Sequence, residues 1–301
     1  MAEAGTRRQA FLLISLLMQR VRIFLALLTA AFLLAPANAQ QLRQPPPYRI
    51  LVSNDDGVRA PGIAALAQIL QAIGDVSIVA PAENYSGAGH SIAGSSDAII
   101  RDDLTLPNGL KAIGLTTTPA STMNVALRNI MKPLPDLVVT GINRGYNLGY
   151  SGYVSGTMGG ARQAAMLGVP AIAASMATAG VPRDLPYGAE EVLGVARRVK
   201  MYGLPPRTFL SVNIPQMPAG GYKGYMVTRQ ATQHGGEEAF AETKHPGSER
   251  TIYWNVFKES TSGAAQGTDV WAVANGYVAV TPLKVGETDE SQVNTLNGWF
   301  K

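Results

Sequence analysis

The sequence predicts an α/β fold in which a largely parallel sheet is flanked by helices and followed by C-terminal β-hairpins or extended arms. Three observations favour this class. Short apolar strands alternate with segments of helical spacing from residue 48 to about 213, as in parallel sheets that helices cover on both faces. Beyond 213, stretches rich in Gly, Pro and polar residues separate β-rich pieces. The composition, 46% hydrophobic and 15% charged over 301 residues, is that of a globular protein with a sizeable core.

Each element is predicted from local spacing. Apolar runs predict buried strands at 48–53, 76–80, 136–140, 169–175, 208–213 and 276–283. Apolar residues that recur every three or four positions predict helices at 61–73, 118–131, 157–167 and 190–202. Pro61 suits the first turn of the first helix, and Gly74 suits its end. The β-rich pieces at 222–229 and 251–256 predict hairpins and extended arms, which commonly pack on a partner subunit, so we expect an oligomer.

The first 39 residues have the pattern of an export signal. Ile23–Pro36 is an apolar run, preceded by arginines, that is too short for a comfortable membrane span. Ala37–Ala39 has the small-residue pattern of a signal-peptidase site. Met18 is a second candidate start and gives a compact signal, and an uncleaved anchor is the alternative. We expect an exported protein, periplasmic or secreted, or a cytoplasmic one if this segment is not a working signal.

The expected domain follows the signal. Residues 40–47 are a polar, Pro-rich leader, and 48–301 form the domain, with the α/β core over about 48–213 and the arm region over about 214–301. Removal of residues 1–39 leaves 21 Lys and Arg against 20 Asp and Glu, a net charge of +1. Binding to nucleic acid by charge alone is not predicted, nor is membrane association after cleavage. The chain has no cysteine, which excludes disulfides, thiolate zinc sites and a cysteine nucleophile.

Two adjacent acidic residues follow the first predicted strand. In Asn54-Asp55-Asp56-Gly57 no Lys or Arg lies between the acids, so their charges repel unless a cation binds nearby. A turn that caps the next helix explains the same residues equally well.

Polar loops also follow two other strands. The Gly-rich loop after 76–80 contains Ser86, although a plain surface loop is the commoner explanation of such a segment. The loop after 136–140 contains Asn143, whose amide oxygen can bind a hard cation, and Gly145. Ser155, Gly156 and Thr157 open the next helix, where hydroxyls and backbone amides suit an anion and equally suit N-capping.

These segments meet if the sheet is parallel, because ligands bind beyond the carboxyl ends of such strands. A site made of Asp55, Asp56, Ser86 and Asn143 is entirely oxygen, which favours Mg²⁺ or Mn²⁺, with Ca²⁺ as a further candidate, over zinc or copper. A hard cation beside donors at a helix N-terminus indicates phosphate chemistry.

The residues then suggest roles. Asp55 or Asp56 would orient or deprotonate an attacking water. The phosphate oxygens would meet Asn143, Gly145, Ser155, Gly156 and Thr157.

Nine segments of the chain match the motifs of one known family. They are ILVSNDDG at 50–57, APGIAAL at 60–66, SGAGHSI at 86–92, DLVVTGINRGYNLG at 136–149, SGT at 155–157, LGVPAIA at 167–173, VNIP at 212–215, TRQ at 228–230 and GYVAVTPL at 276–283. In these segments the chain resembles the SurE family of metal-dependent nucleotidases. The segments keep the family's order from about residue 48 to 283, which is nearly the whole domain.

The resemblance implies a fold, an activity and a ligand set. The fold is a Rossmann-like core, in a homodimer or homotetramer with exchanged C-terminal elements. The activity is hydrolysis of nucleoside 5′- or 3′-monophosphates to nucleoside and phosphate with a divalent metal. The family's metal ligands carry over to Asp55, Asp56, Ser86 and Asn143, and its phosphate-side asparagine carries over to Asn54.

The chain departs from the family at three places around the site. Glu83-Asn84-Tyr85 stands where many members have an Asp-Arg-type pair before the serine. Residues 117–122 read TTPAST where many members have Gly-Thr-Pro-Ala-Asp-Cys, and Tyr150-Ser151-Gly152 replaces acidic residues. The metal ligands are complete, so these departures bear on the choice of base and sugar.

Three other functions compete with this one. Gly89-His90-Ser91-Ile92-Ala93 is close to the nucleophile elbow of a serine hydrolase, but it lacks the final glycine, and neither a strand nor a convincing helix adjoins it. A non-catalytic nucleotide-binding protein would gain nothing from paired carboxylates near phosphate. An exported phosphatase acting on another phosphoester, such as short polyphosphate, would keep the same residues.

Overall fold

The computed structural model describes residues 16–25, 46–177, 184–217, 220–233 and 235–300. The chain forms two units, Met1–Pro46 and Pro47–Lys301. In the first unit the described residues 16–25 are helical. No helix within the described ranges is long and apolar enough to cross a membrane. The predicted signal and leader lie mostly outside the described residues, so both stay predictions.

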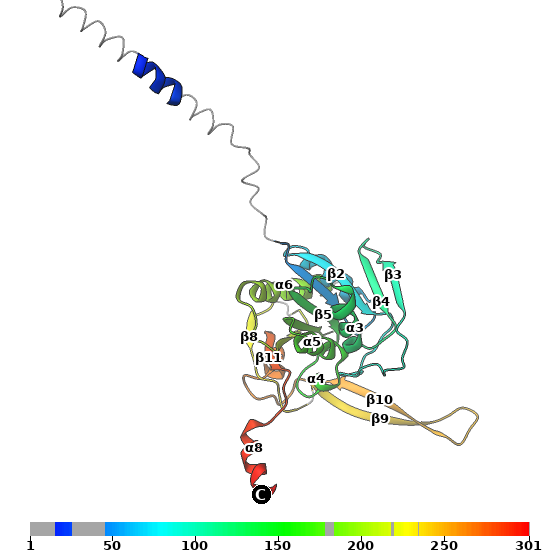
Figure 1. Ribbon diagram of the computed structural model, residues 1–301. Helices are drawn as coiled ribbons and strands as arrows, with labels where there is room; N and C mark the ends of the chain where they lie inside the picture. Colours follow the sequence, from blue (N-terminus) through cyan, green and yellow to red (C-terminus); the bar gives the residue numbers. More distant parts are fainter. Residues whose placement is uncertain (1–15, 26–45, 178–183, 218–219, 234, 301) are drawn as a thin grey trace, which may run out of the picture. The chain divides into compact units, whose positions relative to one another are not determined.

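The second unit is built on one nine-stranded sheet (Figure 1). The strand order is β3-β4-β2-β1-β5-β6-β7-β11-β8, and the five central strands, β2 to β7 in that order, are parallel. The strands are β1 (Arg49–Ser53), β2 (Asp75–Pro81), β3 (Arg101–Thr105), β4 (Lys111–Leu115), β5 (Leu137–Arg144), β6 (Ala171–Met176), β7 (Thr208–Ile214), β8 (Tyr225–Val227) and β11 (Val278–Lys284). The predicted α/β fold is confirmed.

Helices cover both faces of this sheet. The helices are α2 (Pro61–Leu70), α3 (Pro119–Val125), α4 (Ser151–Val154), α5 (Gly156–Met166), α6 (Leu185–Tyr202), α7 (Asp269–Ala274) and α8 (Glu290–Asn297), with a π-helical turn η2 (Ala126–Ile130) and a 3₁₀ turn η4 (Gly298–Phe300). Side chains of α2 and α6 pack on one face, and those of α3, η2 and α5 pack on the other.

The alternation of side chains along a strand supplies both cores. In β1, Ile50 and Val52 point into the α2–α6 core, whereas Leu51 points into the α3–α5 core. All three are fully buried. This two-sided burial explains why the central strands read as unbroken apolar runs.

The order in which strands are added to the sheet reverses at β1. The chain runs from β1 to β2 on one side and returns to place β5 on the other side of β1, with Val52 paired to Ile78 and to Val139. A crevice opens beyond the carboxyl ends of two strands where the order reverses in this way, and ligands of doubly wound folds bind there. The loops after β1 and β5 therefore flank this point.

Several predicted elements differ in the structure. The predicted helix at 118–131 is divided into α3 and η2, and the one at 61–73 ends at Leu70. The strand predicted within 222–229 is short, and β8 and β11 extend the main sheet instead of forming arms. The hairpin of β3 and β4 was not expected because β3 reads RDDLT and is mostly exposed. The short helix α7 was also missed.

An antiparallel hairpin of β9 (Gly236–Lys244) and β10 (Thr251–Glu259) forms a second sheet that extends away from the first in Figure 1. It carries large exposed side chains on both faces. Trp254 and Val256 share one face, and Phe240 and Phe257 share the other. An isolated two-stranded hairpin is marginally stable in water, so these faces call for a covering surface.

The packing of α2 on β5 generates a prediction about Gly62. A methyl group at this position would overlap the carbonyl oxygen of Ile142, which is backbone and cannot yield. Gly62→Ala should lower the free energy of unfolding by about 1–3 kcal/mol, although alanine is the better helix former. Urea denaturation measures this. Gly286→Ala is the matched control because open space surrounds Gly286, and an equal effect of both changes would contradict the packing argument.

Candidate active site

The paired acids lie directly beyond the carboxyl end of β1. Asn54 and Asp55 are buried, with 1% and 2% of their surface exposed, and Asp56 is half-buried. Burial of a carboxylate disfavours its ionised form unless donors or a cation surround it. The partners of these side chains therefore define the site.

The N-terminus of α5 holds Asp55. The Thr157 hydroxyl donates to Oδ1 of Asp55 at 2.5 Å, and Thr157 is fully buried. Gly156 lies against the same carboxylate, since a Cβ atom there would be 2.8 Å from the Asp55 Cβ. Ser155 is the N-cap, with its hydroxyl accepting from the Met158 N–H at 3.2 Å. The positive end of the helix thus meets Asp55 itself.

This arrangement bears on the predicted phosphate contacts. The Thr157 hydroxyl donates to Asp55, and the Ser155 hydroxyl accepts from Met158 as the N-cap of α5. In this structure both side chains therefore position the helix and the acid. The N–H of Gly145 donates to the Met176 carbonyl at 2.9 Å. Contacts of these groups with phosphate stay predictions.

The loop after β5 reaches Asp56. The backbone N–H of Arg144 lies 3.4 Å from Oδ2 of Asp56. Asn143 donates its Nδ2 to the Gly145 carbonyl at 2.8 Å, which leaves its Oδ1 as the free end of the amide. The β5–β6 register shifts between Thr140 and Asn143, and this irregularity sets the direction of the end of β5.

The loop after β2 reaches the same place. The Tyr85 N–H donates to the Asp55 carbonyl at 2.7 Å, and Ser86 follows directly. The Oγ and N–H of Ser86 both donate to Oδ1 of Asn84, at 2.7 and 2.8 Å. The Ser86 hydroxyl proton is therefore directed at Asn84, and its lone pairs remain for another partner.

Asn54 has an unpaired buried atom. Its Nδ2 donates to the Gly57 carbonyl at 2.8 Å, while its Oδ1 is buried without a hydrogen-bond partner in the described structure. An orphaned buried oxygen indicates a ligand or water that supplies a cation or a donor. In this amide orientation Oδ1 of Asn54 offers an acceptor, and Nδ2 keeps a second N–H besides the one that it donates to Gly57.

Both acids are harder to ionise than ordinary aspartates. Burial raises the pKa of Asp55 from 3.8 to about 6, and the neighbouring charge of Asp56 adds to this while Thr157 opposes it. Burial also raises the pKa of Asp56, against the backbone N–H and the positive charge of Arg144. Two adjacent carboxylates with raised pKa values at the switch point of a sheet are typical of a functional site.

Comparison with known proteins identifies the family. The model of the family described as survival protein SurE matches residues 50–237. The chain belongs to the SurE family. A protein named 5′-nucleotidase SurE from Pelobacter propionicus is 36% identical over 250 residues, 83% of this chain and 98% of the relative. One of the same name from Alkalilimnicola ehrlichii is 38% identical over 250 residues, 83% of this chain and 94% of the relative.

A solved SurE structure has the same fold. The crystal structure of the SurE protein from Aquifex aeolicus superposes with a TM-score of 0.72 at 34% sequence identity, covering 84% of this chain and all of that one. The predicted family and fold are therefore confirmed.

The SurE site of this chain is suited to a hard cation. The segments that carry Ser86 and Asn143 converge on the two acids, because the neighbouring Tyr85 and Arg144 contact Asp55 and Asp56. All four side chains offer oxygen atoms as ligands. Within the described part of the chain, no group of three or more His, Cys, Asp or Glu side chains could hold a metal ion. An oxygen-only set with two carboxylates, beside the orphaned Asn54 oxygen, fits Mg²⁺, Mn²⁺ or Ca²⁺ better than zinc.

The serine-hydrolase alternative finds no support in the SurE fold of this chain. Ser91 lies in an exposed loop with no strand before it and no helix after it. His90 bonds to Oε1 of Gln163 at 2.7 Å, and Gln163 bonds in turn to Asn124. This histidine holds the Ser86 loop to α5 and is not paired with Ser91.

Two contributors to the SurE site were not predicted. Arg144 belongs to the matched segment at 136–149, and its position next to Asn143 is the signal in the sequence that points to it. Asn84, which orients Ser86, belongs to a segment that departs from the family's motif. Asn147 has a structural role, since it is buried and bonded to Ser175 and Asn213.

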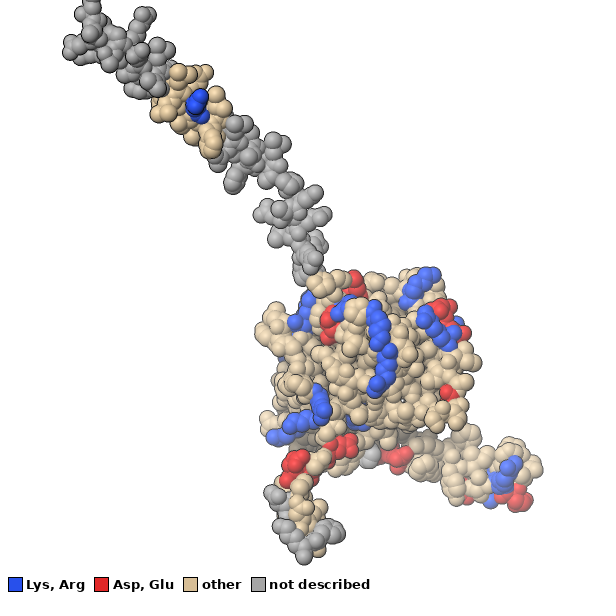
Figure 2. All heavy atoms as spheres, viewed as in Figure 1, with Lys and Arg blue, Asp and Glu red and all other residues tan. Residues whose placement is uncertain are grey.

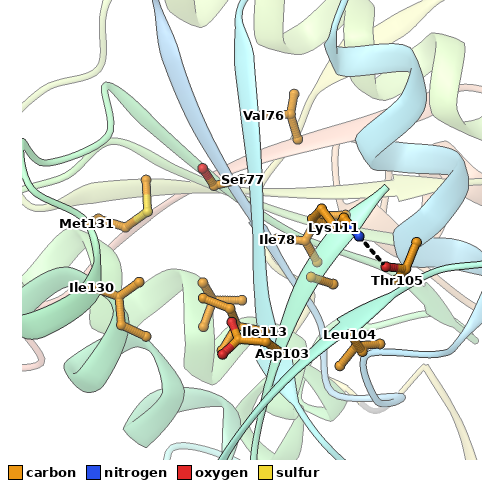
Figure 3. A pocket seen from close by; sticks show the side chains of 12 residues that line it. Val76, Ser77, Ile78, Asp103, Leu104, Thr105, Lys111, Ile113, Ile130 and Met131 are labelled. Carbon is orange, nitrogen blue, oxygen red and sulfur yellow. Dashed lines mark hydrogen bonds between the residues drawn. The ribbon is translucent and has the colours of Figure 1, made fainter. Parts of the chain in front are cut away.

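The cavity in Figure 3 is not this site. It has a volume of about 610 Å³ and is lined by β2, β3, β4 and η2, where the β3–β4 hairpin diverges from the first half of β2. Lys111 donates to Thr105 at 2.7 Å inside it. The site, by contrast, lies beyond the opposite end of β2.

The raised pKa of Asp55 predicts a pH-dependent stability in chelator-treated protein. Its value of about 6 in the fold exceeds the ordinary 3.8, so the fold binds the proton more tightly than the unfolded chain does. The unfolding free energy of the wild type should therefore fall as pH rises from about 4 to above 6. Asp55→Asn should gain roughly 3 kcal/mol relative to the wild type across this window. Urea denaturation in EDTA at each pH measures the difference.

Asp103→Asn is the control for that titration. Asp103 is exposed, and its bond to Arg101 lowers its pKa, so this variant should not gain stability as pH rises. A constant difference between Asp55→Asn and the wild type from pH 4 to 7 would contradict the raised pKa.

Proposed function

We propose that this protein is a 5′-nucleotidase that hydrolyses nucleoside 5′-monophosphates to nucleoside and phosphate, with 3′-monophosphates as a second substrate class and with a divalent cation. The observation that carries the proposal is the pair Asp55–Asp56 at the switch point of the sheet, where three other segments converge. Membership of a family whose relatives at 36–38% identity are named 5′-nucleotidase SurE supports it.

Four side chains would hold the cation. They are the carboxylates of Asp55 and Asp56, the Ser86 hydroxyl and Oδ1 of Asn143. When bound, Mg²⁺ or Mn²⁺, or Ca²⁺ as a further candidate, withdraws charge from phosphate oxygens and lowers the pKa of water. The raised pKa values of the acids support this role, because a nearby cation offsets the cost of ionising both.

The two acids have different freedom. Oδ1 of Asp55 is committed to Thr157, whereas Asp56 has one long contact with the Arg144 N–H. Asp56 is therefore the better group to accept the proton of an attacking water. The water oxygen bonds to phosphorus, the ester P–O bond breaks, and the leaving oxygen takes up a proton. The positive charge of Arg144 beside Asp56 favours an anionic substrate.

The reaction predicts the effect of Asp56→Asn. Loss of the base and of one cation ligand should lower kcat/KM for nucleoside monophosphates by about 100-fold or more. Phosphate release is measured with EDTA, then with Mg²⁺, Mn²⁺, Ca²⁺ or Zn²⁺ added back, on a panel of nucleotides and p-nitrophenyl phosphate. Near-normal release by folded Asp56→Asn would contradict the assignment.

Two variants serve as controls for this assay. Asp103→Asn and Ser91→Ala should both keep wild-type activity, and loss of activity in Ser91→Ala would favour serine chemistry. No release by the wild type with any metal would favour a nucleotide-binding protein, or a phosphatase for another phosphoester such as short polyphosphate.

The proposal includes association and export. The exposed apolar residues on both faces of the β9–β10 hairpin support a homodimer or homotetramer in which this arm packs on a second copy. The apolar run and the Ala-Asn-Ala segment of residues 1–39 support export to the periplasm or outside the cell, where the enzyme would release phosphate and nucleosides from nucleotides.

The arm predicts an oligomer that depends on its aromatic residues. Light scattering should give the wild type two or four times the mass of one chain, and Trp254→Ser combined with Phe257→Ser should give the mass of one chain. Tyr202→Ser is the control, since Tyr202 is a 79% exposed aromatic residue on α6 and not on the arm. An arm variant that keeps the wild-type mass would contradict this role.

A further inference from the structure

Two exposed tyrosines stand beside the site. Tyr150 is the N-cap of α4 and Tyr153 lies within it, with 42% and 52% of their surfaces exposed. Their ring centroids are 6.1 Å apart and their planes are tilted by 56°. Large aromatic surface in contact with water is costly, and its presence next to a binding crevice indicates a ligand or a partner.

Hydrogen bonds on both sides hold α4 in place. The Val154 carbonyl accepts from the N–H of Gly89, in the loop that contains Ser86, at 2.9 Å. The Tyr150 N–H donates to the Gln233 carbonyl at 2.9 Å. The carbonyl of the preceding Gly149 accepts from Nε2 of Gln230 at 2.7 Å, and the Gly149 N–H donates to Oδ2 of Asp269 at 2.9 Å. The rings are thus carried by a fixed segment and not by a loose loop.

The same segment leads into the site within three residues. Gly156, which touches the Asp55 side chain, follows Tyr153 by three positions. Their Cα atoms can be separated by at most about 11 Å. A nucleoside monophosphate has its base and its phosphate at opposite ends of the ribose, so a phosphate beside Asp55 and Asp56 brings the base within range of this surface.

We propose that Tyr150 and Tyr153 form the surface on which the nucleobase of the substrate stacks; this inference rests on the proposed nucleotidase activity. The ring separation and tilt exclude insertion of a base between the two tyrosines, so the base lies on the outer face of one ring. The residues of α4, SGYV, carry no charge, so recognition here is by stacking and not by charge. Purines offer the larger stacking face, and the surface therefore favours purine over pyrimidine nucleotides.

The main competing occupant is a second copy of the chain. The Ser151 hydroxyl accepts from the N–H of Gly235, next to the start of β9, so α4 adjoins the arm. A contact between subunits would make the tyrosines important for mass and stability and leave base preference unchanged. A measurement that separates base recognition from association therefore decides between the two.

The test compares substrates with and without a base. For the purified enzyme, kcat/KM is measured on AMP, UMP and ribose 5-phosphate, for Tyr153→Ala, Tyr150→Ala, Tyr153→Phe and the control Tyr202→Ala. Stacking on one aromatic ring corresponds to a loss of about 5- to 100-fold on its removal. In at least one alanine variant, kcat/KM for AMP should fall by this factor because KM rises. The kcat/KM for ribose 5-phosphate should stay unchanged, and the ratio of kcat/KM for AMP to that for UMP should fall. Tyr153→Phe should behave as wild type.

Three results would overturn the inference. The first is an equal fall of kcat/KM for AMP and for ribose 5-phosphate. The second is an unchanged ratio of kcat/KM for AMP to that for UMP in both alanine variants. The third is a change of oligomeric mass that accounts for the fall of kcat/KM. If the wild type hydrolyses no nucleotide, the proposed function fails, and binding still tests the surface. Calorimetric titration with AMP and with ribose 5-phosphate should then give an affinity for AMP that falls in an alanine variant, and an affinity that stays constant overturns the inference.

Discussion

The contact between Asp55 and the first turn of α5 is the constraint on which the rest of the site depends. A carboxylate with 2% of its surface exposed would be expelled or protonated without compensating donors. The Thr157 hydroxyl and the positive end of the helix supply that compensation. Thr157 is itself tied to the sheet, because its carbonyl accepts from Oγ1 of Thr140 in β5 at 2.8 Å. Helix, strand and acid are therefore fixed as one unit.

The other parts of the site are arranged around this unit by the topology of the sheet. Because β2 and β5 lie on opposite sides of β1, the loops that follow them approach Asp55 and Asp56 from two directions. Tyr85 reaches the backbone of Asp55, and Arg144 reaches the side chain of Asp56. On the face seen in Figure 2, both Lys and Arg and Asp and Glu side chains are exposed. At the site itself the local positive groups are Arg144 and the N-terminus of α5.

Much of this was predictable because buried parallel strands and their terminal loops leave a clear trace in sequence. The unbroken runs of β1, β5, β6 and β7 mark the core, and the polar residues at the ends of β1, β2 and β5 mark the site. The β3–β4 hairpin left no such trace, since β3 is mostly exposed and its sequence, RDDLT, does not alternate between apolar and polar residues. Spacing also could not show that the Thr157 hydroxyl donates to Asp55, nor that Nδ2 of Asn54 donates to the Gly57 carbonyl. Those outcomes depend on hydrogen bonds between segments distant in the chain.

The close packing around α4 and α5 has a consequence for which substitutions this chain can accept. Gly156 is pressed against Asp55, and a side chain on Gly149 would collide with the carbonyl oxygen of Gln233. Single substitutions at these two positions are closed to selection, because any of them displaces the acid or the loop. Tyr150 and Tyr153 lie between these glycines in the chain and are 42% and 52% exposed, so their side chains are less constrained by packing. Substitutions in this stretch are therefore tolerated best at the exposed positions of α4, where they leave the arrangement of Asp55 and Asp56 unchanged.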